Sequence, residues 1–144
     1  MTDINTKPPI SIFELYETDA DAEENGKWFD EFGGKIKFKI RRYSSAASRK
    51  AREVIHRPLL RTYKTFDKIP EDLGDTATVK HLAEAIVVGW EGIYDRQGNE
   101  MAYSKEAALD LFTKLPDLAK QLVLLSINMD SFKKDSTEEV KGNF

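Results

Sequence analysis

The first third of the chain shows the apolar and polar alternation that is typical of strands. In residues 35–41 every second residue is apolar and the others are basic, which predicts a half-buried strand with a charged outer face. Gly33 and Gly34 precede it and can form a turn that needs positive φ. Residues 10–17 and 28–32 are rich in β-prone side chains, and we expect strands there, joined by a polar, acidic loop over residues 18–26.

From Ser44 onward the spacing of apolar residues becomes helical. Ser44 or Ser45 can cap a helix that runs to about Ile55 and ends before Pro58. One side of this helix carries Ala47, Ala51, Val54 and Ile55. A second helix is expected to open at Asp75 or Thr76 and to end near Gly89, with apolar residues at helical spacing from Val79 to Val87.

Two further helices are expected near the C-terminus. Ser104 can cap the first, and Pro116 interrupts it and can start the second. The apolar face of the first is Ala108, Leu111, Phe112 and Leu115; the stripe of the second is Leu118, Leu122, Leu125, Met129 and Phe132.

These elements predict an α+β fold, with an N-terminal antiparallel β-hairpin or small sheet followed by a bundle of about four α-helices. A length of 144 residues is typical of a single domain. Within it we expect a mobile leader at 1–9, a β-rich part at 10–43, a helical part at 44–132 and a frayed tail at 133–144.

Charge is separated along the chain although the net charge is only −3. Eight acidic residues and one lysine lie between Glu14 and Glu31, whereas eleven basic residues and one acidic residue lie between Lys35 and Lys64. Cross-strand pairing or protection of a sheet edge would explain the pattern. Alternatively, Lys35, Lys37, Lys39 and Arg41 form a basic face for an acidic protein segment or nucleic acid. No known nucleic-acid-binding motif accompanies them, so we do not expect specific nucleic-acid binding.

The chain lacks the residue patterns of catalysis and metal binding. There are no cysteines, and His56 and His81, the two histidines, are too far apart in sequence to form a helical metal pair. His81 falls on the polar side of its predicted helix. Asp95 to Gly98 is typical of a β-turn. No apolar run reaches the roughly 20 residues that span a bilayer. We therefore expect neither an enzyme nor a bound cofactor, metal or membrane.

Trp90 stands between Gly89 and Gly92 at the end of a predicted helix. We expect its side chain to pack into the hydrophobic core at the end of this helix. The alternative is that it anchors a partner, because tryptophan is enriched at interface hot spots.

The order of motifs around Trp90 resembles that of the tail assembly chaperones of long-tailed, siphovirus-type bacteriophages. The motifs are Val87-Val88-Gly89-Trp90-Glu91-Gly92, Asp95-Arg96-Gln97-Gly98, Tyr103-Ser104-Lys105-Glu106 and Leu109-Asp110-Leu111-Phe112, followed by Pro116, Leu118 and an end at Ser126–Phe132. The resemblance is good over residues 80–132 and loose over 13–55.

The resemblance implies a chaperone in the host cytoplasm that coats the tape measure protein and helps recruit tail tube subunits. It also implies that a longer form can arise by ribosomal frameshifting, and self-association is expected. A structural minor tail protein or tail terminator of the virion is the first alternative. A nucleic-acid-binding regulator that uses the basic segment 35–64 is the second.

We expect helix-in-groove binding of the tape measure protein. The predicted groove lies between helices 78–88 and 117–132, with Trp90 and Tyr94 at its edge. Its partner-binding residues would be Trp90, Tyr94, Leu118, Leu122, Leu125, Met129 and Phe132.

Overall fold

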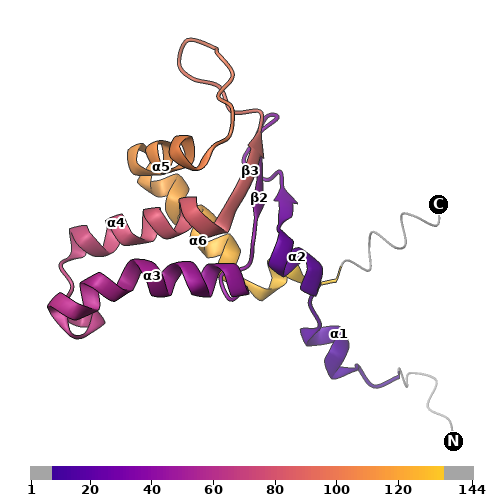
Figure 1. Cartoon of the computed structure of the whole chain (residues 1–144). Coiled ribbons are helices and arrows are strands. Elements are labelled where there is room, and N and C mark those ends of the chain that lie inside the picture. Colours follow the sequence, from indigo (N-terminus) through magenta and orange to yellow (C-terminus); the bar gives the residue numbers. More distant parts are fainter. Residues whose placement is uncertain (1–7, 135–144) are drawn as a thin grey trace, which may run out of the picture.

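The computed structural model describes residues 8–134 (Figure 1). Most of the predicted leader (1–9) and tail (133–144) lies outside the described residues. In chain order the elements are α1 (Ile12–Tyr16), α2 (Ala20–Asn25), β1 (Lys27–Phe29), β2 (Lys37–Ile40), α3 (Ala46–Tyr63), the 3-10 turn η1 (Phe66–Lys68), α4 (Glu71–His81), the π-helical turn η2 (Leu82–Ile86), β3 (Val87–Glu91), α5 (Lys105–Lys114), α6 (Pro116–Ile127) and the 3-10 turn η3 (Met129–Phe132).

The three strands form one antiparallel sheet in the order β1-β2-β3. The period-2 pattern is confirmed, because Phe38 and Ile40 of β2 are buried while Lys37 is exposed. Gly33 and Gly34 both have positive φ, as the predicted turn requires. The α+β class and the four longer helices are confirmed. The predicted order of strands before helices is wrong, since β3 lies between α4 and α5.

The predicted helix 75–89 is replaced by a helix, a π-helical turn and a strand. Helix α4 begins earlier than expected, at Glu71 directly after Pro70, and η2 continues it to Ile86. The chain then leaves helical geometry at Val87 and pairs with β2. Two consecutive β-branched valines favour this change. A bulge opposite Lys39 and Ile40 leaves Val88 without a direct partner.

Two N-terminal segments are helical where a strand and a loop were predicted. Residues 10–17 contain α1, whose Ser11 accepts a hydrogen bond from the amide of Phe13. Residues 18–26 contain α2, which Asp19 caps by accepting from the amide of Ala22. Side-chain capping satisfies the free amides of a helix start. The β-prone composition of residues 10–17 could not reveal that none of the described strands pairs with them.

Helix α3 does not end before Pro58 but continues to Tyr63. Ser45 caps it as expected, accepting from the amide of Ser48 at 3.3 Å. A proline inside a helix removes one backbone hydrogen bond. Leu59, Leu60 and Tyr63 are half-buried beyond it, and this burial offsets the cost.

The starts of α5 and α6 agree with the sequence, but α6 ends at Ile127, earlier than predicted, and Met129–Phe132 form the separate turn η3. Leu115, predicted on the apolar face of α5, is exposed. Ser104 caps α5 by accepting from the amide of Ala107, and Pro116 is the first residue of α6. Ala108 and Phe112 are buried on the inner face of α5.

An aromatic cluster joins the sheet to α5. Phe38 and Trp90 lie opposite each other in the β2–β3 pair, with ring centroids 6.2 Å apart. Phe112 of α5 packs against both rings. The ring centroid of Tyr103 lies 5.3 Å from that of Trp90. The three pairs that Trp90 makes are edge-to-face, a geometry that favours aromatic contact beyond simple burial. The sheet therefore buries one face against the C-terminal helices.

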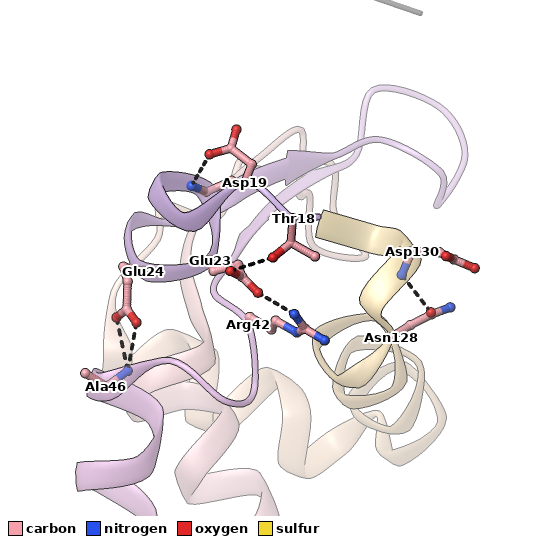
Figure 2. A network of polar contacts seen from close by, with 9 residues as sticks. Thr18, Asp19, Glu23, Glu24, Arg42, Ala46, Asn128 and Asp130 are labelled. Atoms are coloured by element: carbon pink, nitrogen blue, oxygen red, sulfur yellow. Dashed lines mark hydrogen bonds and ion pairs between the residues drawn. The ribbon is translucent and has the colours of Figure 1, made fainter. Parts of the chain in front are cut away.

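The acidic residues of α2 bind the start of α3 (Figure 2). Glu23 forms an ion pair with Arg42 and accepts a 2.9 Å hydrogen bond from Thr18. Glu24 accepts from the amide of Ala46 at 3.0 and 3.2 Å. A carboxylate at a helix N-terminus also interacts favourably with the helix dipole. The opposite charges of the two segments thus meet where Glu23 of α2 contacts Arg42 in the connection between β2 and α3, and not across a pair of strands.

Candidate partner-binding groove

An open groove of about 710 Å³ runs between α3, the α4–η2 segment and α5. We call it the α3–α5 groove. Its apolar lining consists of Ala47, Ala51, Val54 and Ile55 of α3, Ala83 and Ala85 of η2, and Leu109 of α5. The alanines are too small to fill the space between the helices. Val54 is 56% exposed, so an apolar surface is open to solvent.

The α3 part of this lining is the stripe that the sequence predicted. Its members recur at i, i+4, i+7 and i+8 and therefore share one helix face. A stripe of this kind normally packs into the core, but here it is only partly covered. This partly exposed stripe makes the groove the candidate binding site of the described residues.

The rim of the α3–α5 groove is mainly basic. Arg41, Lys50, Lys80 and Lys105 line it together with Glu84 and Glu106. Lys105 and Glu84 form an ion pair at 3.0 Å that links α5 to η2. Lys50 and Lys80 form no ion pair with any of residues 8–134. The groove therefore suits an amphipathic segment with an apolar ridge and acidic flanks.

A buried polar cluster holds α3 against α4 and thereby sets the position of one groove wall. Nε2 of His81 lies 2.8 Å from Oγ of Ser48 and 3.1 Å from its carbonyl oxygen. The Ser48 hydroxyl donates to the carbonyl of Tyr43 at 2.6 Å, and Arg52 donates to the same carbonyl. A neutral His81 that carries its proton on Nε2 satisfies this arrangement. The prediction that His81 lies on the polar side of its helix is wrong.

The pKa of His81 is lowered from 6.5 to about 4. Burial is the main cause, and the nearby Arg52 charge acts in the same direction. His81 is therefore neutral near pH 7. Its contacts within residues 8–134 join α3 to α4.

The stripe predicted to bind a partner lies mostly in the core. Leu122 and Phe132 are fully buried, so neither has surface to offer a partner in this conformation. Leu118, Leu125 and Met129 are half-buried. Because this stripe packs inward with residues of η2, the space predicted between 78–88 and 117–132 is occupied by core side chains. The exposed apolar residues of α6 are instead Leu124 and Ile127.

Trp90 and Tyr94 have different surroundings. Trp90 is only 7% exposed, and its indole N–H donates a 2.7 Å hydrogen bond to the carbonyl of Met101. It is thus a core residue, which is the first of the two interpretations. Tyr94 is exposed and stands at the start of a loop closed by Asp95. Hydrogen bonds from the amide groups of Asn99 lower the pKa of the Asp95 carboxyl, and the predicted turn is confirmed.

The residues of the predicted basic face differ in exposure and surroundings. Lys35 and Lys37 are exposed, and Lys37 lies opposite Glu91 in the sheet. Lys39 is half-buried. Arg41 follows the end of β2 and turns toward the carbonyls of Glu24 and Ala85, at the rim of the groove. The alternation of inward and outward side chains holds only within a strand. Arg41 lies beyond the end of β2, so the alternation does not determine the direction of its side chain.

A second basic surface lies along α3, which we call the arginine face. Arg49, Arg52, Arg57 and Arg61 surround His56 and Phe66 at a shallow cavity of about 540 Å³. Arg57 pairs with Glu53, and Arg52 stacks over the ring of Tyr43. Burial, followed by the Arg52 charge, lowers the pKa of His56. Part of the predicted basic segment 35–64 therefore gathers on this helix.

The described residues provide no metal site and no helix that could cross a bilayer. Among residues 8–134 no group of three or more histidine, aspartate or glutamate side chains could hold a metal ion. No helix in the same range is long and apolar enough to span a membrane. Every buried side-chain nitrogen and oxygen there has a hydrogen-bond partner.

The periodicity of α3 was the sequence signal for one wall of the groove. The rim residues Lys50, Lys80 and Lys105 were missed, because they come from three helices whose packing the sequence does not reveal. Leu109 was missed since it lies outside the predicted inner face of its helix.

A protein-family model described as YdaY prophage protein matches residues 43–143. The match covers more than half of the chain and includes α3 to α6, and with them all of the groove lining except Arg41. No curated protein and no solved structure matches the chain.

Proposed function

The chain belongs to the YdaY prophage protein family, and from this premise we propose that it is a phage tail assembly chaperone. In this proposal it binds and solubilises the tape measure protein in the host cytoplasm and helps recruit tail tube subunits. It acts by binding and not by catalysis. The observation that carries the proposal is the open α3–α5 groove, and the resemblance around Trp90 supports it.

The groove suits the problem that a tape measure protein poses. A long helical protein exposes repeated apolar ridges, which aggregate unless they are covered. One ridge of three or four apolar side chains gains about 1.5–3 kcal/mol for each one fully buried. Association costs about 4–15 kcal/mol, so a single copy would bind weakly. Many copies on one tape measure protein, which can also contact one another, would bind firmly through avidity.

The basic rim narrows the class of segment that the groove would accept. Lys50 and Lys80 would lie beside the flanks of a bound helix. Acidic residues on those flanks would be attracted and basic residues repelled. We therefore propose that the groove takes tape measure segments whose apolar ridge is bordered by aspartate or glutamate. A longer frameshifted form of the chain would carry the same groove and add contacts to the tail tube protein.

Co-expression with the tape measure protein of the same prophage tests the proposal. The wild-type chain should keep the tape measure protein soluble and purify with it in several copies. Val54→Glu places a charge on the groove lining at an exposed position, so the fold should persist while binding is lost. Leu124→Glu is the matched control, because Leu124 is 61% exposed on α6 and outside the groove. If both variants bind the tape measure protein as well as the wild type does, the groove is not the binding site. If only Leu124→Glu loses binding, the binding surface lies on α6.

Finished particles distinguish the proposal from its first alternative. A chaperone should be absent from purified tails, whereas a minor tail protein or tail terminator should be present in fixed numbers. Mass spectrometry of purified particles gives this answer directly.

The arginine face favours one further candidate, a nucleic-acid-binding regulator. The guanidinium groups of Arg49 and Arg61 form no ion pair with any described residue. Phosphate binding would show a steep loss of affinity with added salt. The double variant Arg49→Glu with Arg61→Glu should abolish such binding and leave tape measure binding unchanged if the two surfaces act separately.

A further inference from the structure

The N-terminal arm, residues 10–17 with α1, carries an apolar surface that no element within residues 8–134 buries. Ile10, Ile12, Phe13, Leu15 and Tyr16 are all exposed, and none of the residues of α1 is buried. Phe13 alone is 69% exposed. Isolated exposed apolar residues are ordinary, but five within seven positions form a patch that marks an interaction site.

The arm is also acidic. The arm contains two acidic residues, Glu14 and Glu17, and no basic residue. Glu17 forms an ion pair with Lys134, so Glu14 is the carboxylate that the arm can offer to a partner. The α3–α5 groove has the complementary character, with an apolar lining and an excess of lysine and arginine on its rim. The two surfaces therefore match in both hydrophobicity and charge.

The arm is attached to the body by a very short tether. Glu17 alone separates α1 from Thr18, which pairs with Lys133, and the amide of the next residue, Asp19, donates to the carbonyl of Phe132 at 2.8 Å. Figure 1 shows α1 standing off the body below α2, beside the C-terminal end of the described chain. These contacts hold the arm at the η3 side, whereas the groove is formed by α3, η2 and α5.

We propose that the arm of one copy docks into the α3–α5 groove of a second copy. The apolar side chains of α1 would cover the stripe that contains Ala51 and Val54, and Glu14 would face Lys50 or Lys80. Two copies that exchange arms in this way form a closed pair with a self-complementary interface. This inference rests on the proposed function, because it uses the same groove. It adds that the arm of a second copy fills the groove when no tape measure protein is bound. A tape measure segment would therefore have to displace the arm.

Cysteine cross-linking tests this directly, because the chain has no cysteine of its own. One preparation carries Phe13→Cys and another carries Val54→Cys; the two are mixed and oxidised mildly without any tape measure protein. A disulfide between them must join two copies. Mixing Phe13→Cys with Leu124→Cys is the matched control, since Leu124 is as exposed as Val54 but lies outside the groove.

The expected result is a strong Phe13→Cys to Val54→Cys heterodimer and little product in the control mixture. Equal yields in the two mixtures would overturn the inference. A chain that carries both cysteines and cross-links within itself at high dilution would also overturn it, because the arm would then occupy its own groove. Circular dichroism confirms that each variant is folded.

Sedimentation supplies a second measurement without cysteines. The wild-type chain should reach twice the 16.4 kDa of one copy as its concentration rises. Phe13→Glu and Val54→Glu should each remain monomeric, whereas Leu124→Glu should pair like the wild type. Pairing by both arm and groove variants would contradict the inference.

The two proposals can fail separately. If cross-linking fails but Val54→Glu loses the tape measure protein, the arm does not use the groove and the chaperone proposal stands. If cross-linking succeeds but Val54→Glu still binds the tape measure protein, the groove serves self-association and the client binds elsewhere.

Discussion

Protonation of His81 should destabilise the chain between about pH 6.5 and pH 4. The imidazole is buried between α3 and α4, and its Nε2 lies within hydrogen-bonding distance of two oxygens of Ser48. The ring of Tyr43 packs edge-on against it at 5.3 Å. Burial, together with the charge of Arg52, lowers the pKa of His81 to about 4. A charged imidazole would therefore be poorly tolerated at this helix junction.

The sign and size of the effect follow from linkage. In the unfolded chain His81 has its ordinary pKa of 6.5, whereas in the folded chain the pKa is about 4. The unfolded state therefore binds the proton more tightly, and the free energy of unfolding falls as the pH drops through 6.5 and levels off near 4. The whole difference corresponds to about 3 kcal/mol. About 2 kcal/mol of it should be lost between pH 7 and pH 5. The lowered pKa of His56 adds a loss of the same sign.

Urea unfolding at a series of pH values measures the effect. Working between pH 7 and pH 5 keeps most carboxylates ionised, so the histidines dominate the slope. His81→Gln should be less stable than the wild type at pH 7 but should lose much less stability on acidification. His56→Gln is the control and should retain most of the wild-type slope. A wild-type stability that does not change with pH, or a slope that His81→Gln retains in full, would refute the reasoning.

Two pairs of variants test the backbone and the core. A Cβ on Gly92, at φ +72°, would lie 2.1 Å from the carbonyl oxygen of Lys35, so Gly92→Ala should cost about 3 kcal/mol or more in the free energy of unfolding. Gly98 also has positive φ, but a Cβ there would have no atom within 4 Å, so Gly98→Ala should cost only about 1 kcal/mol. If denaturant unfolding shows similar losses for both variants, the clash with Lys35 is not the cause. Trp90→Ala should cost about 3–5 kcal/mol, whereas Trp28→Ala, at an exposed ring, should cost about 1 kcal/mol; a stable Trp90→Ala chain in thermal unfolding would show that Trp90 is not a core residue.

Local signals predicted the elements whose packing agrees with their own periodicity. The alternation through Phe38 and Ile40 identified β2, and Ser104 and Pro116 marked the starts of α5 and α6. Each of these elements packs a single apolar face against the hydrophobic core. The cap at Ser45 was equally clear.

The failures have a common physical cause, which is that pairing over long sequence distances decided the outcome. Val87 and Val88 continue a helical pattern but become a strand, because the edge of β2 is available to pair with them. Residues 10–17 have β-prone side chains, but none of the strands within residues 8–134 pairs with them, and they contain α1. The groove could not be predicted for the same reason: the α3 stripe was visible, but its partial exposure depends on how closely α4 and α5 approach it.

Amide hydrogen exchange with and without the tape measure protein tests whether the α3–α5 groove binds the tape measure protein. We expect slower exchange over α3, η2 and the start of α5 when the tape measure protein is bound, with little change at the outer face of α6. Val54→Glu should remove this protection. Protection confined to α6, or none at all in a complex that is demonstrably formed, would contradict the claim that the α3–α5 groove holds the client.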